Sequence, residues 1–214
     1  MYEKALKYLK ENKQKLFNLY FDDKFIHNPK IAIFTAGASG AGKTEYAISR
    51  IEKEDFLLHI DTDKIREFFT PIGYNGKNAD EFQRISSKAV DLLYKESINR
   101  GYSIILDTNF ANINIATINI NKALKNGYLI EIVYIYQEID KCIDFAKKRE
   151  NITKRKVPKD KIIYTFKNSM ITTLSIKELF KDNILLTFID RKNNYVYDNI
   201  SSDNFFELVK KDLL

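Results

Sequence analysis

The sequence predicts an α/β fold, in which a mostly parallel β-sheet is flanked by helices and followed by a small C-terminal hairpin and helix. Three observations predict it. Short apolar runs alternate along the chain with longer segments of helical periodicity. Gly101 and Gly127 follow two of these helical segments, where helix ends favour glycine. The apolar runs contain few polar residues, as is typical of strands buried on both faces.

The N-terminal part of the chain is predicted to begin with a helical segment, residues 1–28. Leucines recur at helical spacing within Tyr2–Tyr20 and predict one helix there. Asn28-Pro29 then interrupts the pattern. Ile31–Thr35 is the first expected strand, and a glycine-rich turn connects it to a helix over Thr44–Ile51.

The middle of the chain repeats the alternation of strand and helix. Phe56–Ile60 and Ser103–Leu106 are apolar runs of strand length. Between them, Ala79–Arg100 places apolar side chains near one helical face, and Ile113–Asn126 has the same periodicity. Parallel strands separated by such helices form one sheet, and ligands bind at the carboxyl ends of its strands.

The C-terminal part adds a long strand, two helices, a hairpin and a closing helix. The turn-like residues Asp190 to Asn194 between two apolar runs predict the hairpin. The expected elements are the strand Leu129–Tyr136, the helices Ile139–Glu150 and Lys161–Phe180, the hairpin strands Ile184–Ile189 and Tyr195–Tyr197, and the helix Asp203–Leu214.

The composition is that of one soluble globular domain, expected to span residues 1–214. Hydrophobic residues make up 44% and charged residues 30%, and no apolar run has the length of a membrane span or a secretory signal, so a cytoplasmic location is expected. One cysteine excludes an intramolecular disulfide framework. The formal charge of +6 favours anionic partners such as nucleotides but does not select among them.

The glycine-rich turn matches the phosphate-binding pattern G-x-x-x-x-G-K-[ST] between a strand and a helix, which predicts a P-loop NTPase or kinase fold. Lys43 would supply charge to the β- and γ-phosphates of ATP, and the Thr44 hydroxyl would hold Mg²⁺. The guanine-reading N-K-x-D motif is missing from the sequence, and the chain length favours a kinase over an ATPase machine. The residues expected to hold the phosphates are Gly37, Ala38, Ser39, Gly40, Ala41, Gly42, Lys43 and Thr44.

Carboxylates follow two of the predicted strands. Asp61 and Asp63 are two positions apart, so in an extended segment they would face the same side. Asp63 is the predicted base that accepts the proton of an acceptor hydroxyl, with a helix cap as the alternative role. Asp107 ends the third strand like a Walker B acid, and Asn109 lies in the following loop. Asp91 lies on the preceding helix and could face the same pocket, with a solvated surface charge as the alternative. The expected substrate-binding residues are Asp61, Asp91, Asp107 and Asn109.

A basic segment, residues 147–161, is predicted to form a lid. It contains Arg149 and Arg155, whose guanidinium groups suit the charge that develops on a transferred phosphoryl group. A solvated basic face or a nucleic-acid patch is the alternative. Few aromatic residues lie among these charges, which weighs against binding of single-stranded nucleic acid.

Taken in order, these motifs resemble the zeta toxin family, P-loop kinases of bacterial toxin–antitoxin systems. The resemblance covers about residues 30–160 and implies that ATP and Mg²⁺ are used to phosphorylate the 3′-hydroxyl of the amino sugar of UDP-N-acetylglucosamine. It also implies a small antitoxin as partner. The short apolar runs and the few aromatic residues of the basic segment give no expectation of a membrane or nucleic-acid partner. The matching stretches are residues 37–44, 59–66, 78–84, 105–112 and 148–157.

The resemblance also implies roles for single residues. Lys43 and Thr44 match the positions that bind phosphate and Mg²⁺, and Asp63 matches the base. Asp91 and Asp107 lie where family members carry glutamates that bind the sugar. The lid arginines at the transferred phosphate are Arg149 and Arg155.

Two other functions remain open from the sequence alone. The first is a polynucleotide 5′-hydroxyl kinase, which shares the P-loop and an arrangement like that of Asp63 and Arg66. The second is an ATP-binding switch or interaction module without catalysis.

Overall fold

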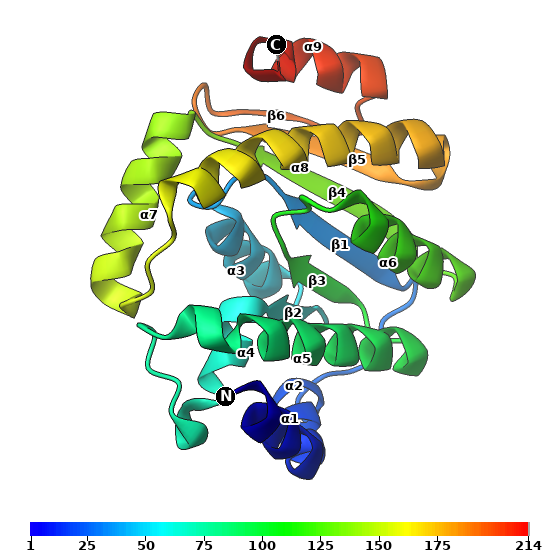
Figure 1. Ribbon diagram of the computed structural model, residues 1–214. Helices are drawn as coiled ribbons and strands as arrows, with labels where there is room; N and C mark the ends of the chain where they lie inside the picture. Colours follow the sequence, from blue (N-terminus) through cyan, green and yellow to red (C-terminus); the bar gives the residue numbers. More distant parts are fainter. Residues whose placement is uncertain (214) are drawn as a thin grey trace.

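A six-stranded sheet forms the centre of the computed structural model, which describes residues 1–213 (Figure 1). The strands run in the order β2-β3-β1-β4-β5-β6; the first five in that order are parallel, and β6 is antiparallel to β5. This architecture confirms the predicted fold class and the C-terminal hairpin. The strands are β1 (Ile31–Ala36), β2 (Leu58–Asp61), β3 (Ile104–Asp107), β4 (Leu129–Tyr136), β5 (Leu185–Asp190) and β6 (Tyr195–Tyr197).

Helices flank the sheet (Figure 1). They are α1 (Tyr2–Glu11), α2 (Lys13–Phe21), α3 (Lys43–Lys53), α4 (Thr62–Glu67), α5 (Ala79–Arg100), α6 (Ile113–Lys125), α7 (Ile139–Thr153), α8 (Lys159–Phe180) and α9 (Ser202–Leu213), with short 3₁₀ turns η1 (Thr70–Ile72) and η2 (Lys181–Asn183). Among the helices in residues 1–213, none combines the length and the apolarity needed to cross a membrane.

The strands are buried because helices cover them. Ile33 in β1, Ile105 in β3 and Val133 in β4 are completely buried, and the residues on either side of each are buried as well. Burial of one such side chain contributes about 1.5–3 kcal/mol to folding. The apolar runs of β2 and β3 therefore correspond to strands that have no solvent-exposed face.

The N-terminal helical segment differs from the prediction. It contains two helices, α1 and α2, and not one, because the chain leaves helical geometry at Asn12, with φ −111° and ψ 19°. The Asn12 side chain donates a hydrogen bond to the carbonyl oxygen of Tyr8 at 3.0 Å. Asparagine competes in this way with the regular backbone bonds of a helix, and the leucine spacing does not reveal the break.

The segment after β2 also differs from the prediction. Asp61 and Asp63 do not lie on one extended segment, because α4 begins at Thr62 directly after the strand. Asp61 caps this helix by accepting a hydrogen bond from the backbone N–H of Asp63 at 2.8 Å. Aspartate is favoured at this position because it satisfies a free N–H group of the first helical turn. The capping role considered for Asp63 thus belongs to Asp61.

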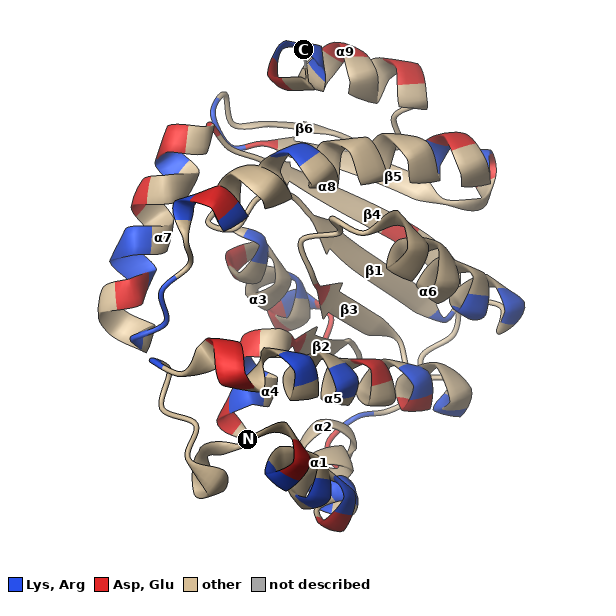
Figure 2. Cartoon of the chain, in the orientation of Figure 1, with Lys and Arg blue, Asp and Glu red and all other residues tan. Residues whose placement is uncertain are grey.

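The basic segment, residues 147–161, is largely helical. α7 extends beyond Glu150, and its last residue is Thr153. Lys154 follows as the C-cap and has a left-handed φ of +61°. A short irregular connection leads to Pro158, and α8 begins at the next residue. Figure 2 shows that Lys and Arg residues gather on the last turns of α7 and on this connection.

Candidate active site

The phosphate-binding loop, residues 37–44, connects β1 to α3 and packs tightly against its neighbours. A Cβ atom on Gly37 would lie 2.3 Å from the carbonyl oxygen of Ile135, and one on Gly40 would lie 2.2 Å from that of Cys142. Both glycines also have φ in the left-handed region, at +130° and +87°. The loop can therefore approach β4 and α7 only with glycine at these positions, and it directs the N-terminus of α3 toward the site.

Lys43 is buried at the start of α3. Its ammonium group donates a hydrogen bond to the carbonyl oxygen of Ala38, within the loop, at 2.6 Å. Burial lowers the pKa of Lys43 to about 8; the nearby carboxylate of Asp107 opposes the shift, and the positive charge of Arg149 adds to it. The last effect places Arg149 within electrostatic reach of the loop. An anion bound here would stabilise the charged form of Lys43.

Asp107 accepts hydrogen bonds from two threonines at the end of β3. The Thr44 hydroxyl donates to Oδ2 at 2.7 Å, and the buried Thr35 hydroxyl donates to Oδ1 at 3.2 Å. Burial works to raise the pKa of Asp107, but the groups of His59, Lys43 and Thr44 outweigh it and hold the pKa below its usual range. An ionised carboxylate beside a hydroxyl is a set of hard oxygen donors, which fits Mg²⁺.

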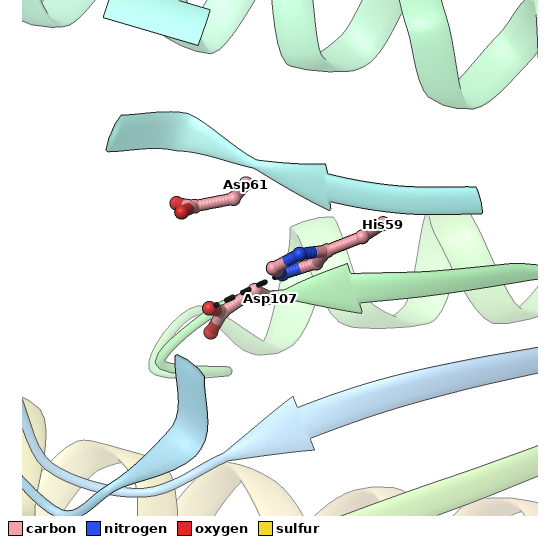
Figure 3. A group of neighbouring side chains, drawn as sticks. All are labelled: His59, Asp61 and Asp107. Atoms are coloured by element: carbon pink, nitrogen blue, oxygen red, sulfur yellow. Dashed lines mark ion pairs between the residues drawn. The ribbon is translucent and has the colours of Figure 1, made fainter. Parts of the chain in front are cut away.

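Asp61 lies beside Asp107 because the parallel register of β2 and β3 pairs these two residues. Figure 3 shows both carboxylates reaching beyond the strands, with the imidazole of His59 next to Asp107. Burial and the charge of Asp107 raise the pKa of Asp61, while its hydrogen bond from the backbone of Asp63 lowers it. Two acids of opposite pKa shift therefore lie at adjacent strand ends.

Asp63 is surrounded by three arginines. Arg66 pairs with Oδ1, and Arg149 donates to Oδ2 at 2.7 Å. Arg155 donates to both carboxylate oxygens at 2.7 Å. Arg66 is almost completely buried and also donates to Gln83. One negative charge thus meets three positive charges, and the excess positive charge would attract an anion.

The structure brings most of the predicted residues together and leaves one apart. Thr44 of the phosphate-binding loop donates to Asp107, Asp107 pairs in the strand register with Asp61, and Arg149 and Arg155 donate to Asp63. Asn109 contributes its backbone, since its carbonyl oxygen accepts a hydrogen bond from the N–H of Gly37 at 3.3 Å. Asp91 is not brought to this cluster. It lies on α5 with half of its side chain exposed and pairs with Lys95, one turn away, at 2.6 Å.

Three residues at the site did not figure in the predicted set. Thr35 holds Asp107, His59 lies next to the same carboxylate, and Arg191 follows β5. The guanidinium group of Arg191 lies 3.4 Å from the carbonyl oxygen of Gly42 in the phosphate-binding loop. The sequence contains a signal for Arg191, because this polar residue comes directly after the apolar strand β5. The acids at the ends of β2 and β3 are predicted from the same pattern.

This geometry defines a P-loop kinase fold, and solved structures share the fold. The toxin–antitoxin system PezAT of Streptococcus pneumoniae contains a chain that superposes with a TM-score of 0.72 at 20% identity, over 96% of this chain and 91% of that one. A structure of AvrRxo1-ORF1:-ORF2 with ATP gives a TM-score of 0.72 at 12% identity, over 98% and 71%.

A family model described as Zeta toxin matches residues 18–202, and the chain therefore belongs to the zeta toxin family. The match confirms the family resemblance inferred from the motifs. It also extends beyond them, from α2 to the start of α9. No curated protein sequence gives a significant match to the chain.

Proposed function

We propose that the chain is a kinase that transfers the terminal phosphoryl group of ATP to a sugar hydroxyl of a nucleotide sugar, UDP-N-acetylglucosamine or a related UDP-sugar. The observation that carries the proposal is one continuous set of contacts. Thr44 of the phosphate-binding loop contacts Asp107, Asp107 pairs in register with Asp61, and Asp61 holds the backbone of Asp63. The candidate triphosphate site and the candidate base are thus connected through residues at the ends of β2 and β3 and at the start of α3.

The chemistry assigned to these residues is phosphoryl transfer. Asp63 orients the acceptor hydroxyl and takes its proton as the oxygen attacks the γ-phosphorus, and the bond to the β–γ bridging oxygen breaks to release ADP. Arg149 and Arg155 stabilise the charge on the transferred group. Thr44 and Asp107 would hold Mg²⁺, which neutralises phosphate charge when bound. Lys43 supplies a further positive charge to the same phosphates.

Arg149 and Arg155 can pair either with Asp63 or with a bound phosphate. In the structure, Arg149 and Arg155 contact Asp63 itself. A bound phosphate would compete for these guanidinium groups, because planar guanidinium binds phosphate as well as carboxylate. Release of Asp63 from the lid arginines would then coincide with arrival of the nucleotide, so that the base becomes available to an acceptor only when the donor is present.

The comparisons support the donor and the partner more closely than the acceptor. One related fold was solved with ATP, and another comes from a toxin–antitoxin system. We therefore propose ATP as the donor, a toxin role for the chain and a small antitoxin as its partner. The UDP-sugar acceptor rests on the family to which the chain belongs.

The proposal is tested by a screen with γ-labelled ATP and Mg²⁺. UDP-sugars form one arm and 5′-hydroxyl oligonucleotides the other. We expect label on a UDP-sugar and a mass increase of about 80 Da, that of a phosphoryl group. Label on the oligonucleotides would replace the proposal with a polynucleotide kinase. Binding of ATP with no labelled product in either arm would favour the non-catalytic switch.

Nucleotide binding is expected to be accompanied by proton uptake near neutral to alkaline pH. Phosphate charge would raise the pKa of Lys43 from its value of about 8 in the free protein. Between the free and bound pKa values the complex holds more protons than the free protein, so affinity for ATP falls as pH rises through this range. Calorimetric titration in buffers of different ionisation enthalpy measures the uptake, which should approach one proton at about pH 9 and be small at about pH 7. No uptake at the higher pH would contradict this role of Lys43.

The connection between the basic segment and the rest of the site can be tested at Gly76. A Cβ atom there would lie 2.4 Å from the carbonyl oxygen of Thr153, at the end of α7, and Gly76 has a φ of +84°. Gly76→Ala should displace the segment that carries Arg155 and reduce phosphoryl transfer by about 10-fold or more. Gly73→Ala is the matched control, because Gly73 also has left-handed φ but no atom lies within 4 Å of its Cβ position. Equal transfer rates in the two variants would show that this contact does not position the arginines.

A further inference from the structure

His59 is a buried side chain without a hydrogen-bond partner. Its side chain is 5% exposed, and neither ring nitrogen forms a hydrogen bond with any group in residues 1–213. Burial of an unsatisfied polar group costs about 1–3 kcal/mol, so such groups call for an explanation. Nε2 lies within ion-pair distance of Oδ2 of Asp107, but the separation of 3.6 Å is too long for a hydrogen bond.

The position of His59 follows from the strand geometry. His59 and Asp61 are two residues apart in β2, so their side chains lie on the same face of the sheet. The register of β2 and β3 then places Asp107 next to Asp61. One donor atom from each of the three residues lies within 4.8 Å of the others, and all three residues are buried (Figure 3).

We propose that His59, Asp61 and Asp107 form a binding site for a divalent transition metal that is occupied without nucleotide. One imidazole and two carboxylates are a donor set that suits Mn²⁺, Co²⁺ or Zn²⁺. Mg²⁺ prefers oxygen donors and would bind beside the phosphates at Thr44 and Asp107, so the carboxylate of Asp107 is shared by the two sites. The metal gives one of the two ring nitrogens of His59 a partner, and it neutralises two adjacent buried carboxylates.

The dimensions of the cluster agree with this assignment. Bonds from such metals to nitrogen and oxygen donors are about 2.0–2.2 Å long, so opposite donors are separated by about 4.4 Å at most. A separation within 4.8 Å closes onto an ion through small rotations of the carboxylates. The donors lie at the ends of two paired strands, which holds the site in place before any ligand binds.

The test uses Mn²⁺ as the probe and nucleotide-free, tag-free protein. Electron paramagnetic resonance is expected to show one bound Mn²⁺ per chain, and pulsed measurements are expected to show coupling to an imidazole nitrogen. His59→Gln should remove the nitrogen coupling and weaken Mn²⁺ binding by about 10-fold or more. His27→Gln is the matched control, because His27 is the other histidine of the sequence and should leave both signals unchanged.

Several results would overturn the proposal. The proposal is wrong if nucleotide-free protein does not bind Mn²⁺ or if bound Mn²⁺ shows no coupling to nitrogen. It is also wrong if the nitrogen coupling persists in His59→Gln. If His59→Gln does not fold, Asp61→Asn decides, since it should weaken binding and keep the nitrogen coupling. The readout contains no ATP and no acceptor, so the result is independent of whether the chain is a kinase.

Discussion

Asp63→Asn is expected to reduce phosphoryl transfer by about 10²-fold or more while the chain remains folded. The amide cannot take the proton of the acceptor hydroxyl, but its oxygen can still accept hydrogen bonds from the surrounding arginines. Asp63→Ala is a poorer test, because Arg66 is 2% exposed and would lose its charged partner. We expect that variant to lose stability as well, by about 2 kcal/mol or more.

The measurement is a single-turnover assay with labelled ATP and the acceptor found in the screen, combined with thermal unfolding. Asp80→Asn, the same chemical change at an exposed position in the first turn of α5, serves as control. A turnover of Asp63→Asn within about threefold of wild type would exclude Asp63 as the base.

Lys43→Met should reduce phosphoryl transfer to a similar extent as Asp63→Asn. The free energy of unfolding should be unchanged or higher. Loss of the ammonium group removes a positive charge from the phosphates, where preorganised charge contributes about 10²-fold or more to the rate. Burial lowers the pKa of Lys43, which shows that the fold disfavours its charge. Methionine has a similar shape and no charge to bury.

Transfer assays and thermal unfolding of the purified variant measure both effects. Lys53→Met, at the exposed far end of the same helix, is the control. Expression in a bacterial host adds a second readout: wild type should harm growth, and Lys43→Met should not. Equal growth with the two proteins would argue against a toxin role, and normal transfer by Lys43→Met would contradict the assigned chemistry.

Much of the fold was predictable because its signals are local. Buried parallel strands appear as short apolar runs, and Gly101 ends α5 with a left-handed φ, as the sequence suggested. The break at Asn12 and the early start of α4 were not predicted. Both depend on whether one polar side chain forms a hydrogen bond with the backbone of a residue a few positions away. Such bonds compete with the regular backbone hydrogen bonds of a helix at nearly equal energy.

The site was predictable to a lesser degree. The phosphate-binding loop is contiguous, so its spacing predicts it, and the position of Asp107 at the end of a strand predicts that it lies beside this loop, where it accepts a hydrogen bond from Thr44. Periodicity placed Asp91 on a helix but could not show that its side of α5 faces solvent and pairs with Lys95. The rotation of a helix depends on what it packs against, which lies elsewhere in the chain.

The sequence by itself determined the alternation of strands and helices and the loop that binds phosphate, since both arise from residues close together in the chain. Only the tertiary structure decided that Arg149 and Arg155, 86 and 92 residues after Asp63, would meet on its carboxylate. It also decided that His59 would lie buried beside Asp107 without a hydrogen bond to either ring nitrogen. Contacts of this kind depend on the packing of helices and on strand register, which are set by burial summed over the whole core and not by any local pattern.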